Sequence, residues 1–212
     1  MKKIIAILLT TVLILTVFAG CSSTTPSSAG KNTDSGKSGT DIDNGPKLSK
    51  DQKAILADLE KEFSVDGYEK EIADELKADE ETTQIVDSLG ITVDDYVGGI
   101  VKHYGWTFGD ITVDGDAAVA AVTMTYPDFD KMGEVLDAKA DEWLEAQGGV
   151  DKVTEEQFYQ AYGKIVMDIL NSEDFPVLTA DFNVDYIKDG KDWVIKDRDA
   201  VTDTMNEAQG AA

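Results

Sequence analysis

The residue types that most enzymes use for catalysis are scarce in this sequence. It contains one histidine, His103, and one cysteine, Cys21. An intramolecular disulfide is therefore excluded, and so is a zinc site built from several Cys and His side chains. His103 lies near the end of a segment of helical spacing, beside Tyr104. Histidines at helix ends are commonly structural, so we do not expect His103 to act as the base of a Ser-His-Asp triad.

Carboxylates are abundant, and some have the alternating spacing of calcium ligands. Asp181, Asn183 and Asp185 match the first ligand positions of a calcium loop, but Tyr186 stands where that loop needs glycine and no glutamate closes it. The aspartates within residues 110–116 fail the same template and are typical of turns. We therefore expect no metal site and no cofactor, with loose calcium binding left open.

The cysteine has an informative context. Two lysines precede a mostly apolar run over residues 4–18, which small residues follow, as in a signal peptide. The stretch 18–21, Phe-Ala-Gly-Cys, resembles the lipobox of bacterial lipoproteins. The resemblance implies that residues 1–20 are removed and that Cys21 carries acyl chains such as palmitate. A retained membrane helix is the alternative, but the apolar run is shorter than the roughly 20 residues that span a bilayer.

The rest of the chain divides by composition. Residues 21–46 are Ser, Thr, Gly, Asp, Asn and Lys with almost no apolar side chain, which predicts a disordered, lipidated tether. Residues 47–200 have enough apolar and aromatic residues for one globular domain. The last residues, 201–212, are expected to form a flexible tail.

The net charge of the chain limits the classes of partner that it can bind. The residues after Gly20 carry 42 acidic and 17 basic side chains. Nucleic acid is therefore excluded as a partner, because its binding depends on basic side chains that neutralise phosphates. Anionic membrane surfaces repel such a chain as well, so we expect contact with the membrane only through the lipid on Cys21.

Hydrophobic periodicity predicts five helices, and each carries an apolar stripe at helical spacing. Thr92 is a good N-cap for the third helix, and Thr154 with Gln157 forms a capping box for the fifth. The expected helices cover residues 48–63, 65–78, 92–104, 129–147 and 154–170.

Two segments have the residue pattern of β-strands instead of the helical spacing. Residues 106–113 and 117–126, separated by Asp-Gly-Asp, predict a β-hairpin. Residues 178–186 alternate apolar with polar side chains, and Asp189-Gly190 turns them into a partner strand. No strand-helix-strand repeat is present, so the expected fold is α+β: an antiparallel curved sheet packed against several helices, cone-like.

The segment from Tyr104 to Asp128 and the closing hairpin at 189–195 resemble the lipoprotein branch of the nuclear transport factor 2-like, or cystatin-like, superfamily. The resemblance covers about residues 50–200 and implies a Gram-positive surface protein with a cone-shaped domain. Some members of this superfamily are isomerases or dehydratases, and others only bind a ligand or dimerise. The fold therefore leaves the function open.

The leading hypothesis is an extracytoplasmic lipoprotein, anchored to the cell membrane and facing outside, whose acidic domain binds a surface protein or a small ligand without catalysis. A homodimer is left open. The alternative is a small isomerase- or hydrolase-like enzyme that uses carboxylates, because a buried carboxylate pair leaves no spacing signature. The candidate pocket residues are one histidine and three aromatics expected near the mouth of the cone: His103, Trp106, Tyr126 and Trp143.

Overall fold

The computed structural model describes residues 48–65 and 68–210; the expected signal peptide, Cys21 and the tether lie outside them. The described part contains seven α-helices, one 3₁₀ helix and four strands. The elements in chain order are α2 (Lys50–Glu62), α3 (Tyr68–Ala78), α4 (Glu80–Ser88), α5 (Val93–Val101), β1 (Gly105–Asp114), β2 (Ala117–Pro127), α6 (Phe129–Ala146), η2 (Val150–Lys152), α7 (Glu155–Leu170), β3 (Val177–Asp189), β4 (Asp192–Ile195) and α8 (Arg198–Ala208).

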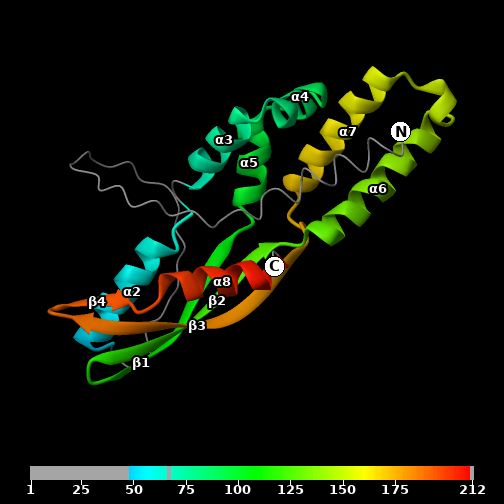
Figure 1. Cartoon of the computed structure of the whole chain (residues 1–212). Coiled ribbons are helices and arrows are strands. Elements are labelled where there is room, and N and C mark those ends of the chain that lie inside the picture. The colour runs from blue at the N-terminus through cyan, green and yellow to red at the C-terminus, as the bar shows by residue number, and fades with distance from the viewer. Residues whose placement is uncertain (1–47, 66–67, 211–212) are drawn as a thin grey trace.

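The molecule is elongated and has two halves (Figure 1). In one half, α2 and α8 lie against an antiparallel sheet of order β1-β2-β3-β4; the other half contains α3 to α7. Each half has its own cluster of buried apolar residues, one between sheet and α2 and one among the five helices. The expected α+β class, with an antiparallel sheet packed against helices, is confirmed.

A β-bulge in β1 keeps its apolar residues on the covered face of the sheet. Trp106 and Phe108 occupy even positions, whereas the next apolar residue, Ile111, occupies an odd one. Without an extra residue this change of parity would turn Ile111 outward, because side chains alternate along a strand. The register shifts between Phe108 and Ile111, which restores Ile111 to the buried side.

Helix α2 covers the sheet with a stripe that is fully buried at Ile55 and Leu59. A capping box between Ser49 and Gln52 begins the helix. The Gln52 side chain also donates a 2.7 Å hydrogen bond to the Ile111 carbonyl oxygen of the bulged strand. The capping box and the hydrogen bond to β1 thus both stabilise the start of α2.

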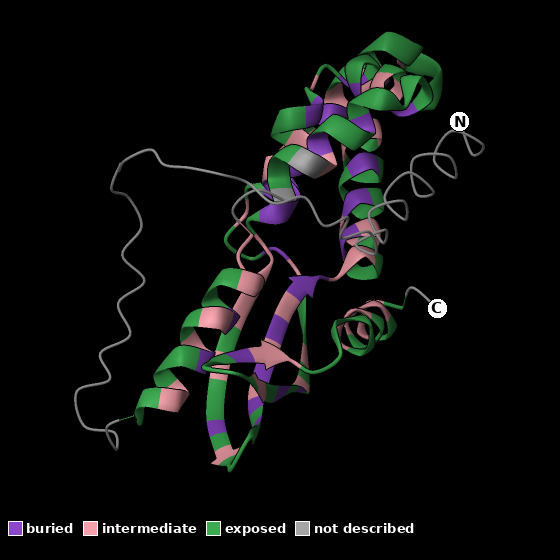
Figure 2. Cartoon of the chain, turned by 60° about the vertical axis from the view of Figure 1, so that its left-hand side comes forward, coloured by how far each residue is buried: buried purple, intermediate pink, exposed green. Residues whose placement is uncertain are grey.

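The C-terminal segment differs from the expected flexible tail, because residues 201–208 belong to helix α8. The Asp197 side chain caps this helix by accepting from the amide of Ala200. Val201 and Met205 pack on the sheet cluster, and the Tyr126 hydroxyl donates a 2.7 Å hydrogen bond to the carbonyl of Ala208. No residue of α8 is fully buried, as the half-buried and exposed colours in Figure 2 show.

Two helix boundaries also differ from the expectation. Helix α5 ends at Val101 rather than at residue 104, because the chain must cross to the sheet half before β1 begins at Gly105. Helix α4 was not expected; it is short, and Thr82 and Thr83 disfavour an isolated helix. None of the helices in the described ranges is long and apolar enough to cross a membrane.

Candidate functional site

The helical half encloses an apolar cavity between α3, α4, α5, α6 and α7. The space that the centres of water-sized molecules can occupy in it is about 50 Å³, enough for about four waters or the end of an alkyl chain. None of the residues that form its wall is a carboxylate, a histidine or a basic residue. They are Leu76, Thr82, Ile85, Val86, Leu89, Ile91, Tyr96, Phe129, Met132, Gly133, Leu136, Tyr162 and Val166.

Two other hollows are roomier by the same measure, at about 270 and 230 Å³. The larger is formed by a single stretch, 144–159, where α6 turns into α7. The second lies on the uncovered face of the sheet and includes Thr123 and Asp181. The cavity among the helices is the stronger candidate site, because segments far apart in sequence enclose it and its lining is almost wholly apolar.

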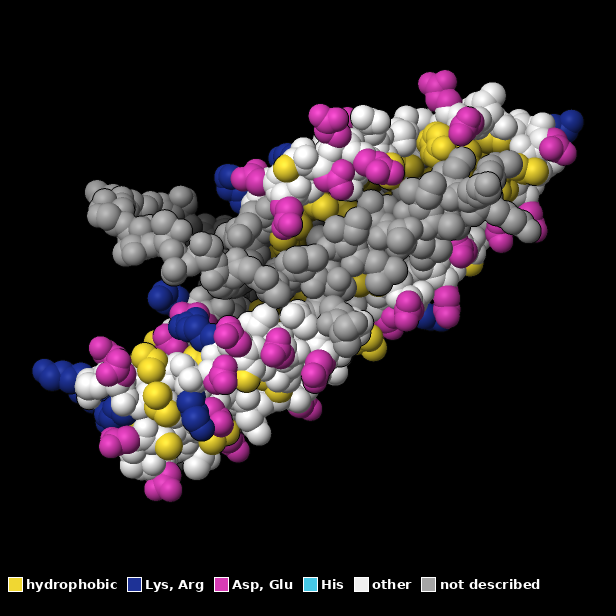
Figure 3. All heavy atoms as spheres, in the orientation of Figure 1, with side chains coloured by type: hydrophobic (Ala, Val, Ile, Leu, Met, Phe, Trp, Pro, Cys, Tyr) yellow, Lys and Arg dark blue, Asp and Glu magenta, His cyan; other side chains and the backbone are white. Residues whose placement is uncertain are grey.

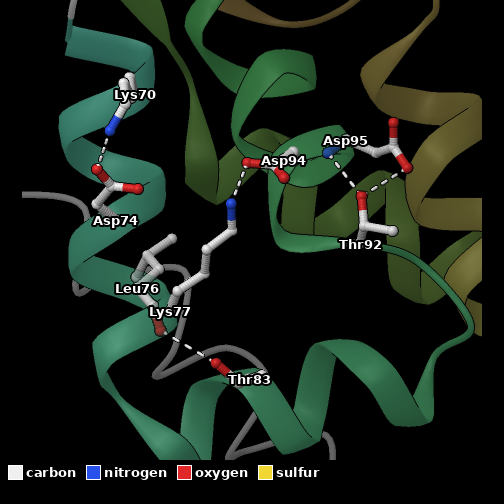
Figure 4. A network of polar contacts seen from close by, with 8 residues as sticks. All are labelled: Lys70, Asp74, Leu76, Lys77, Thr83, Thr92, Asp94 and Asp95. Atoms are coloured by element: carbon white, nitrogen blue, oxygen red, sulfur yellow. Dashed lines mark hydrogen bonds and ion pairs between the residues drawn. The ribbon is translucent and has the colours of Figure 1, made fainter.

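Polar contacts outside the cavity hold its first three helices together (Figure 4). Lys77 at the end of α3 donates a 2.5 Å hydrogen bond to Asp94 at the start of α5. The Thr83 hydroxyl of α4 donates to the Leu76 carbonyl at 3.3 Å. Thr92 caps α5 by accepting from the amide of Asp95. The first two contacts thus join the end of α3 to α5 and α4, and the third lies within α5.

Helix α7 closes the cavity by an unusually close approach to the α4–α5 connection. A Cβ atom at Gly163 would lie 2.0 Å from the carbonyl oxygen of Leu89. No backbone atom can give way by that much, so only glycine fits here. Gly163 thereby lets Tyr162 and Val166 line the cavity beside Leu89.

Two phenol groups are the main polar features of the lining. Neither the Tyr96 nor the Tyr162 hydroxyl has a hydrogen-bond partner within residues 48–65 and 68–210. Burial raises the pKa of Tyr162 to about 12, with a smaller effect from Asp137. Burial, and then the neighbouring Tyr162, raises the pKa of Tyr96 further. Both hydroxyls thus stay protonated at neutral pH. The third polar side chain, Thr82, is already bonded to Asp79 at 3.1 Å.

His103 lies between the two halves and not in the cavity. Its ring stacks on Phe175 with the centroids 3.7 Å apart, and its Nε2 is 2.8 Å from the carbonyl oxygen of Leu170. One face of the imidazole is thereby engaged in packing and its Nε2 in a backbone contact. The geometry agrees with a structural histidine.

The three aromatic candidates are dispersed. Trp106 packs in the sheet half, with its ring 4.9 Å from that of Phe63. Trp143 packs in the helical half against Phe158. Tyr126 is buried and bonded to α8. The structure does not bring these three or His103 together, and none of the four lines the cavity among the helices.

The aspartates tested against a calcium loop lie on the exposed face of β3. Asp181, Asn183 and Asp185 are all exposed, and Asp181 accepts a 2.6 Å hydrogen bond from Thr123. Within the part of the chain that the structure describes, no group of three or more His, Cys, Asp or Glu side chains could hold a metal ion.

Sequence reasoning missed the residues that matter most for this site. Thr82, Ile85 and Val86 come from α4, and Leu89 is its C-cap; this helix was not expected. The signal was present: Asp79 is a good N-cap, and the apolar residues after it have helical spacing. The cavity itself depends on the packing of five helices and has no signature in the sequence.

No family model matches the sequence, and no curated protein matches it. Among solved structures, the chain resembles a crystal structure described as that "of a putative lipoprotein (ycdA)" from Bacillus subtilis, with 14% sequence identity and a TM-score of 0.41. The match covers 74% of this chain and 55% of that protein, so the chain spans about half its length. Such a likeness is too low to assign a fold family, and the nuclear transport factor 2-like domain stays a prediction.

Proposed function

We propose that this chain is an extracytoplasmic lipoprotein, attached to the membrane through Cys21, whose helical half binds a small and largely apolar ligand. The proposal includes no catalysis. The ligand would occupy the cavity among α3 to α7, and the sheet half would serve as the scaffold that carries the helices.

The lining of the cavity is the observation that carries the proposal. Apolar walls with a few polar groups are typical of sites that bind small molecules. General acid-base chemistry most often uses a histidine, carboxylate or lysine in reach of the bound molecule, and it can also use a tyrosine; of these residue types, only Tyr96 and Tyr162 line this cavity. The two tyrosine hydroxyls are suited to orient a ligand, since a protonated hydroxyl can both donate and accept a hydrogen bond.

The anchor is supported by the sequence at its start. The apolar run over residues 4–18 and the stretch Phe-Ala-Gly-Cys that ends at Cys21 have the order of a lipoprotein signal. An acidic chain gains no electrostatic attraction to an anionic membrane. Stable attachment would therefore depend on acyl chains, of which two suffice.

Extraction of the ligand tests the proposal. The mature chain is purified in phosphatidylcholine nanodiscs, denatured, and its released small molecules are identified by mass spectrometry against empty nanodiscs. Val86→Phe fills the cavity, whereas Val119→Phe makes the same change on the exposed sheet face, where Val119 is 40% exposed. We expect a molecule that wild type and Val119→Phe retain and Val86→Phe loses. Retention of the same molecules by all three proteins would contradict the proposal.

The same preparation distinguishes the enzymatic alternative. A carboxylate enzyme would convert its bound molecule, so the extracted species would change with time of incubation. If turnover were seen and were lost on changing one carboxylate to its amide without a change in thermal unfolding, the non-catalytic part of the proposal would be wrong.

A further inference from the structure

The chemistry around the cavity points to a class of ligand. Resting on the proposed function, we propose that the ligand is a small single-chain amphiphile with a cationic head, whose alkyl end enters the cavity and whose head lies beside Tyr96 and Tyr162. Three features of the described residues carry this: the shape of the apolar space, the two tyrosines, and the charges of the helices that form the walls.

The apolar space suits a short unbranched chain. The centres of water-sized molecules can occupy only about 50 Å³ of it, and aliphatic side chains form most of its wall. A fused ring system does not fit such a volume. Each methylene that moves from water into it contributes about 0.8 kcal/mol, so an alkyl end of a few carbons is the part of the ligand that this wall recognises.

The tyrosines suit a cationic head. A phenol oxygen accepts hydrogen bonds through its lone pairs, and the Tyr96 and Tyr162 hydroxyls have no partner among the residues described. Three aromatic residues, Tyr96, Tyr162 and Phe129, line the same space. Aromatic faces attract ammonium groups, more strongly where water is excluded. Ammonium N–H groups can therefore be satisfied by the two oxygens while the charge lies against the rings.

The charges of the surrounding helices favour a cation over an anion. Residues 68–102 and 128–174, which contain α3 to α7, carry 23 Asp and Glu and only 7 Lys. The lysines next to lining residues are already paired: Lys77 with Asp94, and Lys131 with Glu134. The magenta carboxylates spread over this half of the visible surface in Figure 3.

Several carboxylates of the cavity helices lack such a partner. Glu80, Glu81 and Asp87 of α4 and Asp137 of α6 make no ion pair with any described residue. Asp137 is near enough to Tyr162 to raise the pKa of its hydroxyl. An anionic head beside Tyr162 would be repelled by this carboxylate, whereas a cationic head would be attracted.

Three five-carbon probes that differ only in the head test the inference. Binding of n-pentylamine, 1-pentanol and pentanoate to the mature chain in phosphatidylcholine nanodiscs is measured by NMR titration at neutral pH, with empty nanodiscs as the reference. We expect pentylamine to bind at least about tenfold more tightly than pentanoate, and this preference to shrink in high salt because screening weakens the attraction. Tyr162→Phe should weaken pentylamine several-fold and leave pentanol less affected.

Two variants locate the binding. Val86→Phe should abolish binding of all three probes, and Val119→Phe should leave it unchanged. If Val86→Phe fails to fold by circular dichroism, Tyr162→Phe carries the test, since it removes one oxygen only. Equal or tighter binding of pentanoate would overturn the cationic head while the proposed function stands. Absence of binding by all three probes would overturn both.

Discussion

The imidazole of His103 lies flat on the ring of Phe175, with the two planes inclined by only 10°. His103 belongs to the connection from α5 to β1, and Phe175 to the connection from α7 to β3. The hydrogen bond between Nε2 of His103 and the carbonyl of Leu170, the last residue of α7, links the α5–β1 connection to this helix as well. A carbonyl only accepts, so Nε2 carries the proton. The histidine therefore joins the α5–β1 connection to the end of α7 and the residues that follow it.

Stability should depend on the protonation of His103. Burial lowers the pKa of His103 from its ordinary value of 6.5, and Lys102 adds to this, while the bond to Leu170 opposes it. As the pH falls, His103 of the unfolded chain therefore binds its proton at a higher pH than His103 of the folded chain does. The stabilising contribution is present above about pH 6.5 and is lost as the pH falls through the folded pKa. We expect the free energy of unfolding to decrease from pH 7.5 to pH 5.5.

His103→Phe provides the control, because it keeps a ring on Phe175 but cannot titrate. At pH 7.5 it should lose about 1 kcal/mol with the bond to Leu170. Its stability should change much less between the two pH values in urea unfolding experiments. Carboxylates with a lowered pKa, such as Glu62 and Asp79, lose their contribution to the free energy of unfolding only below the pH range of this experiment. An identical pH dependence for both proteins would show that His103 is not the titrating group.

The close approach of α7 to the α4–α5 connection can be tested at one glycine. Gly163→Ala places a Cβ 2.0 Å from the Leu89 carbonyl oxygen and should destabilise the fold by about 3 kcal/mol or more. Gly98→Ala is the matched control: its Cβ meets only the flexible end of Glu69, at 3.0 Å, so the gain in helix propensity of up to about 1 kcal/mol should prevail. Equal stabilities of the two variants in urea would contradict the packing described here.

The position of α8 depends on Tyr126. Tyr126→Phe removes the donor to the Ala208 carbonyl and should cost about 1 kcal/mol locally. We expect faster hydrogen exchange over residues 201–208 and unchanged exchange in β2. Tyr159→Phe, which removes only the exposed bond to Glu155, should leave α8 unaffected. If the C-terminal residues exchange at the rate of an unstructured chain in wild type, the expected flexible tail would be correct after all.

Cys21→Ser tests the anchor. Serine lacks the thiol that the lipid transfer requires, so the variant should carry no diacylglycerol and should retain its first 20 residues. Intact mass and membrane fractionation measure both. A wild-type chain that is found uncleaved and unmodified in the membrane would favour the retained helix instead.

The sequence predicted the fold class because its local signals agree with the tertiary packing. The alternation in β3 holds from Ala180 to Lys188, with Val184 and Tyr186 buried and Asp185 exposed between them. The burial fades toward Leu178, which is 44% exposed where the strand leaves the cover of α2. That gradient comes from the length of the neighbouring helix, which the pattern of one strand does not contain.

Two helices were missed for a shared reason. Helices α4 and α8 are short, and isolated short helices are marginal in water. Each packs against a neighbour: α4 against α7, and α8 against the sheet. Their N-caps, Asp79 and Asp197, were the available signals.

The prediction of the candidate pocket residues was wrong for a different reason. Aromatic residues such as Trp106 and Trp143 were assigned to one mouth, whereas the interior is divided into two separate clusters.

Hydrogen exchange with a neutral probe tests most directly whether the helical half binds a small apolar ligand. The mature chain in nanodiscs is exchanged with and without 1-pentanol at ten times its dissociation constant, where binding stabilises the occupied region by about 1.4 kcal/mol. The account predicts roughly tenfold slower exchange in peptides from α4, α6 and α7, with β1 to β4 unchanged, and no slowing in Val86→Phe. Slowing confined to the sheet half, or equal slowing in Val86→Phe, would contradict it.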